Sequence, residues 1–342
     1  MKILIIKLSA IGDVVQTLPA LEAIKKIFPD SEITWVVEEA AADLLVGHPL
    51  INRLLVSHRR AWLRQLKNPF TTWRGLSGIT RFILSLRSIH YDIAIDFQGL
   101  FKSGVLIGFA RAGRKIGFDR TRELSYLFLN ERLQAYDIEK HALERYLDIA
   151  RYLGARDVSP LCSLPIEQER GIINQRIDAV KPPGRRLVVM NPGARWTTKL
   201  WPERNFAELA DWLIQEKNAT VIFTGSPDDR EMVERIVTLM RHGVAENWAG
   251  KTTLKELAAL AAVSDLFITT DTGSMHVAAA VGSKVLALFG PTAPWRTGPY
   301  GNSNTVVRSG IACSPCYQRT CEKNVKCMTG ITVEDVMKKL QL

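Results

Sequence analysis

The 342-residue sequence contains no long apolar run, and this absence excludes a conventional membrane-spanning helix. No segment reaches the roughly 18 apolar residues that such a helix needs. The N-terminal stretch MKILIIKLSAIGD is apolar, but its run is too short for a signal peptide and no small-residue cleavage site follows it. We therefore expect a first buried strand at this position and a cytoplasmic protein.

Sequence patterns typical of two other enzyme classes are also missing. The first turn, LSAIGD, lacks the G-x-G-x-x-G pattern of dinucleotide oxidoreductases. The stretch AGKTTLKEL (249–257) resembles a P-loop, but Ala245 stands where that pattern requires glycine. No homeodomain, zinc-finger or RNA-recognition signature accompanies the net charge of +10. We therefore expect neither an NTPase, nor a dehydrogenase, nor a nucleic-acid-binding protein.

Acidic residues are absent from Ser57 to Arg87, where the basic charge is concentrated. Four aromatic residues lie between seven cations in this segment; the cations are Arg59, Arg60, Arg64, Lys67, Arg74, Arg81 and Arg87. This combination predicts a surface for a large amphiphilic anion at a membrane. The alternative is a solvated basic helix that binds nothing in particular.

Strand and helix patterns alternate along the chain in two similar series. The first begins with KILIIKLSAIG, and the second begins with RLVVMNPGA after the Pro/Gly-containing stretch KPPGRR (181–186). We expect helices at 13–28, 203–217, 227–241 and 252–263, with apolar strands between them. The sequence therefore predicts an α/β fold of two doubly wound, Rossmann-like domains facing a cleft.

The stretch LFITTDTGSMHVAAAVGSKVLALFGP (266–291) predicts a strand, a polar loop and a small-residue helix. In open α/β sheets, ligands bind outside the carboxyl ends of the strands. The free N–H groups and positive dipole end of the helix would favour an anion there, most simply a phosphate. The alternative is that Asp271 or Ser274 only caps the helix.

Five stretches together resemble the bacterial lipopolysaccharide heptosyltransferases of glycosyltransferase family 9, over nearly the whole chain. They are KLSAIGDVVQTLPAL, VVEE (36–39), IDFQGLFKSG (95–104), NPGARWTTKLWP (191–202) and TTDTGSMHVAAAVG (269–282). The resemblance implies a GT-B fold with an acceptor-binding domain over 1–175 and an ADP-heptose-binding domain over 186–328. We expect the C-terminal helix, 329–342, to pack back on the N-terminal domain.

The implied reaction moves L-glycero-D-manno-heptose from ADP-heptose to Kdo of the inner core (Kdo-lipid A). Its transition state resembles an oxocarbenium ion, so it needs a base for the acceptor hydroxyl and positive charge at the departing diphosphate. The resemblance assigns these roles to Asp13 and Lys199. The alternatives are a helix-capping carboxylate and a solvated lysine.

The resemblance also implies the residues of the two binding sites. The expected donor-binding residues are Lys199, Asp229, Thr252, Asp271, Thr272, Gly273 and His276. The expected acceptor-binding residues are Ser9, Arg59, Arg60, Arg64, Gln98, Lys102 and Arg122. No D-x-D triplet is present to hold a catalytic ion, so Lys199 and the helix N-terminus would replace a metal, and no cofactor is expected.

Four cysteines near the C-terminus have the spacing C-x2-C-x4-C-x5-C, which makes Cys313, Cys316, Cys321 and Cys327 a weak zinc candidate. This tail resembles enzymes that add the second heptose, whereas the N-terminal half resembles heptosyltransferase I. Since the acceptor should bind the N-terminal domain, we favour the first heptose, with heptosyltransferase II as the alternative. A non-catalytic polyanion-binding module is the alternative of another class. We expect a monomer on the anionic cytoplasmic face of the inner membrane.

Overall fold

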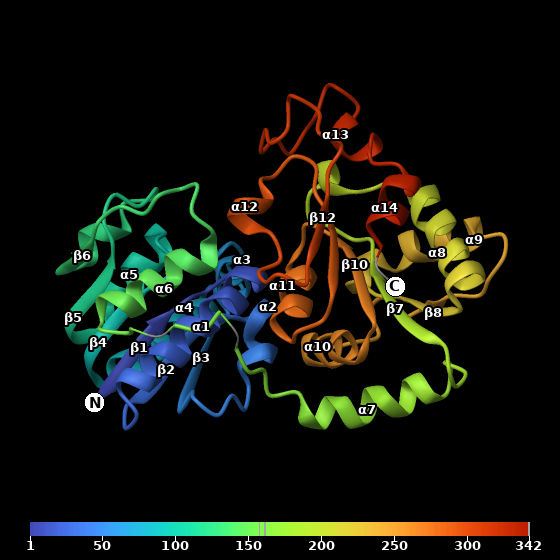
Figure 1. Cartoon of the computed structure of the whole chain (residues 1–342). Coiled ribbons are helices and arrows are strands. Elements are labelled where there is room, and N and C mark those ends of the chain that lie inside the picture. Colours follow the sequence, from blue (N-terminus) through green and yellow to red (C-terminus); the bar gives the residue numbers. More distant parts are fainter. Residues whose placement is uncertain (157, 161, 341–342) are drawn as a thin grey trace. The chain divides into compact units, whose positions relative to one another are not determined.

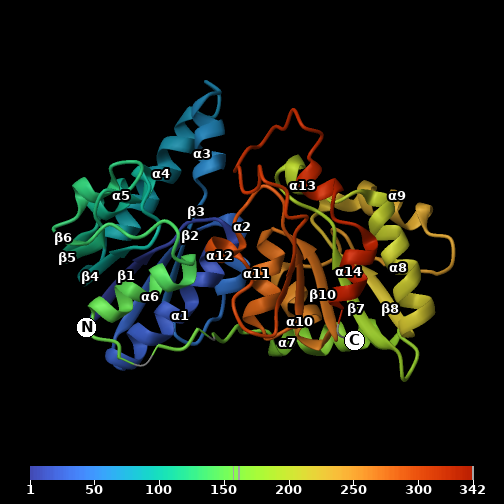
Figure 2. The same cartoon turned by 45° about the horizontal axis from the view of Figure 1, so that its top comes forward.

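The computed structural model describes residues 1–156, 158–160 and 162–340, which form two compact units, 1–165 and 166–342. Each unit contains one six-stranded, wholly parallel sheet with helices on its faces (Figures 1 and 2). Parallel strands need crossover connections, and the alternating strand and helix patterns supply them. The two Rossmann-like domains predicted from the sequence are therefore confirmed.

The sheet of unit 1 has the strand order β3-β2-β1-β4-β5-β6. Its strands are β1 (Lys2–Ile6), β2 (Glu32–Glu38), β3 (Arg53–Ser57), β4 (His90–Asp96), β5 (Arg111–Phe118) and β6 (Glu131–Leu133). Its helices are α1 (Ile11–Ile27), α2 (Glu39–Ala42), α3 (Arg59–Leu66), α4 (Thr72–Arg87), α5 (Phe101–Phe109) and α6 (Ala142–Tyr152), with short 3-10 turns η1 (Asp43–Leu45) and η2 (Ser125–Phe128). Helix α1 continues through Pro19.

Unit 2 repeats this topology with the order β12-β11-β10-β7-β8-β9. Its strands are β7 (Arg186–Asn191), β8 (Ala219–Phe223), β9 (Glu246–Asn247), β10 (Leu266–Thr270), β11 (Val285–Leu288) and β12 (Thr305–Val307). Its helices are α7 (Glu167–Asp178), α8 (Glu203–Lys217), α9 (Arg230–Leu239), α10 (Leu254–Val263), α11 (Gly273–Ala280), α12 (Pro294–Thr297), α13 (Lys326–Thr329) and α14 (Val333–Lys339), with η3 (Thr197–Lys199) and η4 (Pro227–Asp229). Counted from its own first strand, each sheet has the order 3-2-1-4-5-6, which explains why the strand starts KILIIK and RLVVMN look alike.

The boundary between the two units differs from the sequence-based expectation. Unit 2 begins before α7, so residues 166–175 do not belong to the N-terminal domain; α7 packs on α10. The expected packing of the C-terminal helix α14 on the N-terminal domain stays a prediction. Val333 and Val336 of this helix are buried in the core of unit 2, where α14 contacts α8 and removes its apolar face from water.

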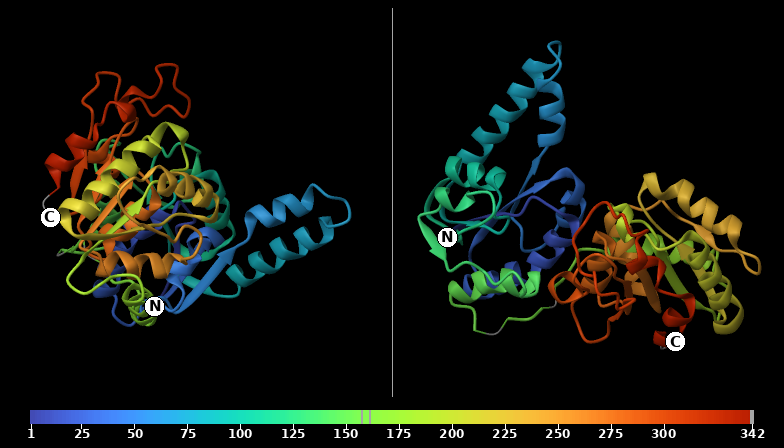
Figure 3. Two further views of the ribbon diagram at one scale, coloured as in Figure 1. Left: turned by 90° about the vertical axis from the view of Figure 1, so that its right-hand side faces the viewer. Right: turned by 90° about the horizontal axis from the view of Figure 1, so that it is seen from above.

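The acid-free segment forms a helical hairpin of α3 and α4 rather than one basic helix. The hairpin extends from the sheet of its own unit (Figure 3). Trp62 of α3 packs against Gly75 and Gly78 of α4 and stacks obliquely on Phe82, with ring centroids 5.4 Å apart. The two glycines let the helices approach closely, because a Cβ at either position would collide with the Trp62 side chain or its neighbours. Among the helices of the described residues, none is long and apolar enough to cross a bilayer.

Candidate active site

In unit 1 the strand order reverses between β1 and β4, and the loops after these two strands lie side by side. Gln98, after β4, accepts hydrogen bonds through Oε1 from the backbone N–H groups of Leu8 and Ser9, after β1, at 2.9 and 3.0 Å. Asp96 in turn holds the backbone N–H groups of Gln98 and Gly99 at 2.9 and 3.0 Å. Ligands of open α/β sheets bind at such a point of reversal.

Asp13 lies in the first turn of α1, beside these loops, and its two carboxylate oxygens have different partners. Oδ2 accepts a hydrogen bond from the N–H of Ala10 at 3.1 Å, so the expected capping role is real. Oδ1 accepts a hydrogen bond from the Tyr146 hydroxyl at 2.8 Å and lies 3.9 Å from Nζ of Lys7. The side chain is 40% exposed, so substrate has access to a carboxylate that the protein holds in place.

Lys7 and Tyr146 were not predicted from the sequence, and both are buried behind Asp13. Nζ of Lys7 donates to the Tyr146 hydroxyl at 2.7 Å and to the carbonyl of Phe97 at 3.2 Å. Burial lowers the pKa of Lys7, although Asp13 and Asp96 oppose that shift. Burial, assisted by Asp13, raises the pKa of Tyr146 well above its ordinary value, so its hydroxyl remains a neutral donor. A lysine that ends a buried apolar strand was the available signal for Lys7.

A second polar cluster joins three predicted acceptor-binding residues through one that was missed. Glu38, at the end of β2, accepts from Lys102 at 2.7 Å and from Arg59 at 3.3 Å, and Lys102 also donates to Oγ of Ser9 at 3.1 Å. Burial opposes ionisation of Glu38, but Lys102 and Arg59 outweigh it and lower the pKa of that carboxyl. The signal was present, since Glu38 belongs to the VVEE stretch.

The structure does not bring the other predicted acceptor residues into this cluster. Arg60 and Arg64 lie on α3, and neither side chain forms an ion pair within the part of the chain that the structure describes. Arg122 is exposed in the loop after β5, whose Thr121 packs closely on Gly99: a Cβ on that glycine would lie 3.2 Å from the Thr121 methyl group. The roles of these three arginines therefore remain predictions.

In unit 2 the corresponding reversal lies between β7 and β10, and the predicted donor site is there. Thr270 donates a hydrogen bond to the carbonyl of Gly193 at 2.9 Å, and Asn191 donates to Oγ of Ser274 at 3.2 Å. Helix α11 begins in this loop with Thr272 as its N-cap and no side-chain capping bond. The alternative in which Asp271 or Ser274 only caps the helix is therefore wrong, and the helix N-terminus with Gly273 fits an anion.

Lys199 and Asp271 form a shielded ion pair at this site. Nζ of Lys199 lies 2.6 Å from Oδ2 of Asp271, and the two side chains are 16% and 8% exposed. Thr292 donates to the same oxygen at 2.5 Å, and the ammonium lies 4.7 Å from the ring centroid of Trp196. Because a carboxylate repels a diphosphate, we interpret Asp271 as the residue that holds Lys199 in position, which refines its expected role as a direct ligand.

The remaining predicted donor residues occupy different parts of unit 2. Oδ2 of Asp229, in η4, accepts from the N–H and hydroxyl of Ser226 at 2.8 and 2.6 Å. A Cβ on Gly193 would lie 2.6 Å from the Asp229 carboxylate, so only glycine permits this close approach. Thr252 is half-buried just before α10, and His276 is half-buried in the first turns of α11. Their proposed contacts with nucleotide and sugar remain predictions.

The four C-terminal cysteines are the predicted weak zinc candidate. Within the described residues, no group of three or more His, Cys, Asp or Glu side chains is arranged to hold a metal ion. Cys313 and Cys321 are exposed, whereas Cys327 is buried, and burial, together with the nearby thiols, raises the pKa of Cys327. The zinc candidate therefore has no support from this geometry.

Comparison with known proteins shows the family of this chain. The model of glycosyltransferase family 9 (heptosyltransferase) matches residues 79–326. Lipopolysaccharide core heptosyltransferase OpsX of Haemophilus influenzae is 32% identical over 99% of this chain and 96% of its own length. Lipopolysaccharide heptosyltransferase 1 of Pseudomonas aeruginosa is 31% identical over 94% of this chain and 87% of its own.

Among solved structures, ADP-heptose lps heptosyltransferase II of E. coli superposes with a TM-score of 0.77 at 25% identity, covering 99% of this chain and 97% of that one. The similarity to these relatives and to this structure extends over both units rather than one domain. The family match covers more than half of the sequence, including the carboxyl-end loops of β4, β7 and β10. The chain therefore belongs to glycosyltransferase family 9, the heptosyltransferase family, and is a glycosyltransferase.

Proposed function

We propose that this enzyme transfers L-glycero-D-manno-heptose from ADP-heptose to Kdo of Kdo-lipid A, without a metal ion. The observation that carries the proposal is Lys199, fixed by Asp271 at 2.6 Å beside the uncapped N-terminus of α11. A fixed cation and a helix N-terminus together stabilise the charge that develops on a departing diphosphate. The names of the similar relatives support heptose as the transferred sugar.

The reaction assigns one chemical task to each site. A hydroxyl oxygen of the acceptor attacks the anomeric carbon of the heptose while Asp13 accepts the hydroxyl proton. The bond between the anomeric carbon and the diphosphate oxygen breaks, and ADP leaves with that electron pair. Tyr146 and Lys7 hold Asp13 in place from the buried side, and Lys199 with α11 compensates the charge on the diphosphate.

The acceptor distinguishes our proposal from the alternative of the second heptose. The Ser9, Lys102, Glu38 and Arg59 cluster supports an acidic acceptor in unit 1, because it presents two cations for one carboxylate. Product analysis of the purified enzyme with ADP-heptose should show transfer to Kdo-lipid A. Transfer only to its monoheptosylated form would establish heptosyltransferase II instead. Binding of either lipid with no release of ADP would favour a non-catalytic polyanion-binding protein.

We further propose that the enzyme works at an anionic membrane surface, on the cytoplasmic face of the inner membrane, and that the tip of the α3–α4 hairpin contacts the lipid (Figure 3). Phe70 and Trp73 at this tip are 93% and 79% exposed, although the hairpin is already packed through Trp62. The tip also carries Lys67 and Arg74 and no acid. Exposed aromatic residues among cations are typical of segments that lie at an anionic lipid interface.

Vesicle flotation tests this surface without requiring catalysis. The wild-type protein should float with phosphatidylglycerol-containing vesicles, and the double variant Phe70→Ser/Trp73→Ser should lose most of that binding. Leu239→Ser/Val244→Ser is the matched control, because it removes two exposed apolar side chains from unit 2, one of them 87% exposed. Equal flotation of both variants would contradict the proposal. A change in sedimentation of the tip variant without vesicles would indicate self-association instead.

A further inference from the structure

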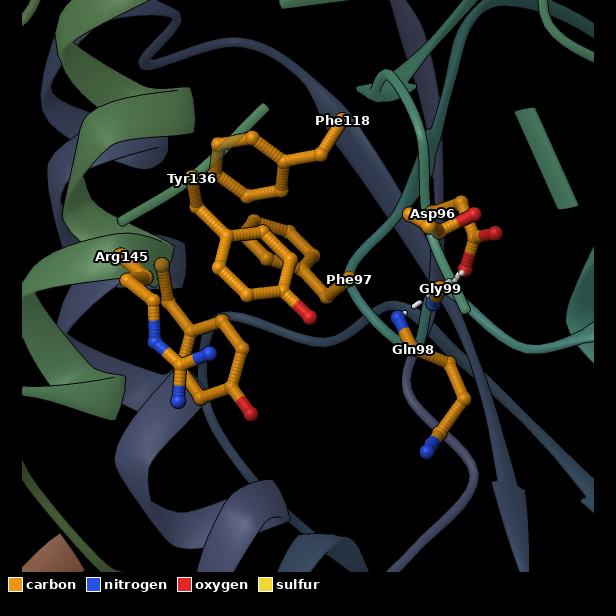
Figure 4. Close-up of a pocket in the computed structure, with 9 residues that line it drawn as sticks. Asp96, Phe97, Gln98, Gly99, Phe118, Tyr136 and Arg145 are labelled. Atoms are coloured by element: carbon orange, nitrogen blue, oxygen red, sulfur yellow. Dashed lines mark hydrogen bonds between the residues drawn. The ribbon is translucent and has the colours of Figure 1, made fainter. Parts of the chain in front are cut away.

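A small cavity of about 60 Å³ opens at the carboxyl ends of β4 and β5, next to the proposed base. Figure 4 shows that side chains from β4, the following loop, the segment after β6 and helix α6 surround it. Its lining residues are Asp96, Phe97, Gln98, Gly99, Phe118, Thr121, Tyr136, Arg145 and Tyr146. The proposed function assigns no task to the aromatic side of this cavity or to Arg145.

Arg145 is a cation whose charge is not compensated here. Its Nε is buried without a hydrogen-bond partner, and its guanidinium forms no ion pair within the residues that the structure describes. Its Cζ lies 4.6 Å from the ring centroid of Tyr136, which Figure 4 shows beside it. By contrast, Arg151 on the same helix pairs with Glu144 at 2.7 Å and Asp148 at 2.8 Å. Arg145 as a whole is half-buried, but a buried N–H donor such as its Nε costs free energy unless a ligand or water accepts its hydrogen bond.

The acids nearest to this cavity already have other partners. The Asp96 carboxylate accepts from the backbone of Gln98 and Gly99 and from the hydroxyl of Ser103 at 3.0 Å. Asp13 accepts from Tyr146 and Ala10. Lys7, the other nearby cation, lies behind Tyr146 and donates to it. An incoming anion at the cavity would therefore meet Arg145 first.

We propose that Arg145 binds the carboxylate of an acidic sugar in the acceptor and thereby places that sugar beside Asp13. The planar fork of arginine matches a carboxylate through two parallel hydrogen bonds, and the cation–π contact with Tyr136 helps to hold the guanidinium at the cavity. Phe97 and Phe118 supply apolar surface against which the sugar ring can lie. Arg145 directly precedes Tyr146, the residue that holds Asp13, so one turn of α6 carries both the proposed carboxylate-binding residue and the residue that positions the base.

This inference rests on the proposed glycosyl transfer, and a pair of acceptors separates the two. Initial rates are measured with the full-length enzyme, ADP-heptose, and either the Kdo-lipid A acceptor or the same acceptor with its sugar carboxylates reduced to alcohols. Arg145→Gln should raise the KM for the native acceptor roughly 10- to 100-fold, the usual value of a charge-assisted hydrogen bond, and leave the KM for ADP-heptose unchanged. With the reduced acceptor, wild type and Arg145→Gln should have the same KM.

The control variant is Arg151→Gln, which removes the same charge from the same helix but lies outside the cavity. Its KM for both acceptors should stay close to that of the wild type. Arg145→Lys should restore only part of the affinity, since lysine keeps the charge but loses the fork. The inference would be overturned if Arg145→Gln raised the KM for both acceptors equally, or raised it for neither. If the wild type transfers heptose to neither acceptor, the proposed function itself fails.

Discussion

The hydroxyl of Tyr146 on α6 donates a hydrogen bond to Oδ1 of Asp13 on α1 at 2.8 Å, across 133 residues of sequence. Burial keeps this phenol neutral, so it acts as a fixed donor to the carboxylate. Helices α1 and α6 pack closely along the same side of unit 1, and that packing brings the pair together. A donor of this kind stabilises the ionised form of the Asp13 carboxylate and restricts its orientation.

We expect Asp13→Asn to lower turnover by about 10²- to 10⁴-fold, because general-base catalysis contributes that much. Binding of ADP-heptose, measured by calorimetry, should stay unchanged since Lys199 and α11 belong to the other unit. Near-normal turnover would leave Asp13 with only its capping bond to Ala10.

Tyr146→Phe should cause a smaller loss and a diagnostic change in the pH profile. Removing a hydrogen bond to a carboxylate raises its pKa, so the acidic limb of the kcat/KM profile should move to higher pH. Tyr126→Phe, in the same unit but without a contact to Asp13, should leave the limb in place. A uniform fall in rate with no shift of the limb would indicate that Tyr146 serves packing alone.

Lys199→Ala should lower turnover strongly, because the variant loses the cation proposed to face the departing diphosphate. Asp271→Asn keeps the cation but removes the carboxylate that holds it at 2.6 Å, so it should weaken ADP-heptose binding and turnover less than Lys199→Ala. The double variant should be no worse than Lys199→Ala alone, since both changes act on one group. Additive losses would mean that Asp271 contacts the donor independently.

Activity should survive excess EDTA, because the chain has no D-x-D triplet and the proposed site compensates the diphosphate with Lys199 and a helix N-terminus. Initial rates with and without the chelator should agree. A loss that Mg²⁺ or Mn²⁺ reverses would contradict metal independence and direct attention to Asp228, Asp229 and Asp271. A loss that only zinc reverses would direct it to the cysteine tail.

Replacing Arg59 and Arg60 with alanine should raise the KM for the acceptor and leave that for ADP-heptose nearly unchanged. Salt should weaken acceptor use more in the wild type than in this variant, because screening acts on charges that the variant lacks. Arg230→Ala/Arg235→Ala on α9 makes the same change of net charge in unit 2 and serves as the control. Equal acceptor KM values in wild type and Arg59→Ala/Arg60→Ala would show that these arginines do not bind the acceptor.

The stability of the protein at acidic pH should depend on Glu38. Lys102 and Arg59 hold the pKa of this carboxyl below its ordinary value of 4.5, even though burial opposes them. A carboxyl with a lowered folded-state pKa stabilises the fold fully above the ordinary value, and that contribution is lost as pH falls through the folded-state value. Urea unfolding should show a steeper loss of stability below about pH 4.5 in the wild type than in Glu38→Gln. Parallel curves would mean that the pair is absent in solution.

Local patterns in the sequence were enough to predict the two Rossmann-like units. The strand starts KILIIK and RLVVMN are buried runs, and Glu203–Lys217 forms the helix that its apolar spacing predicted. The loops at Asp13, Gln98, Lys199 and Asp271 were also predictable, because carboxyl ends of parallel strands are where ligands bind. These features depend on residues close together in the chain.

The partners of the site residues were decided only by tertiary packing. Tyr146 reaches Asp13, Lys102 reaches Glu38, and Thr292 reaches Asp271 because, within each unit, different crossover helices and loops converge on one sheet edge. Nothing in the local sequence of α6 shows that Tyr146 is buried against Lys7 or that Arg145 lacks an acid. The sequence of the C-terminal helix shows an apolar face, but only the folded chain places Val333 and Val336 in the core of unit 2.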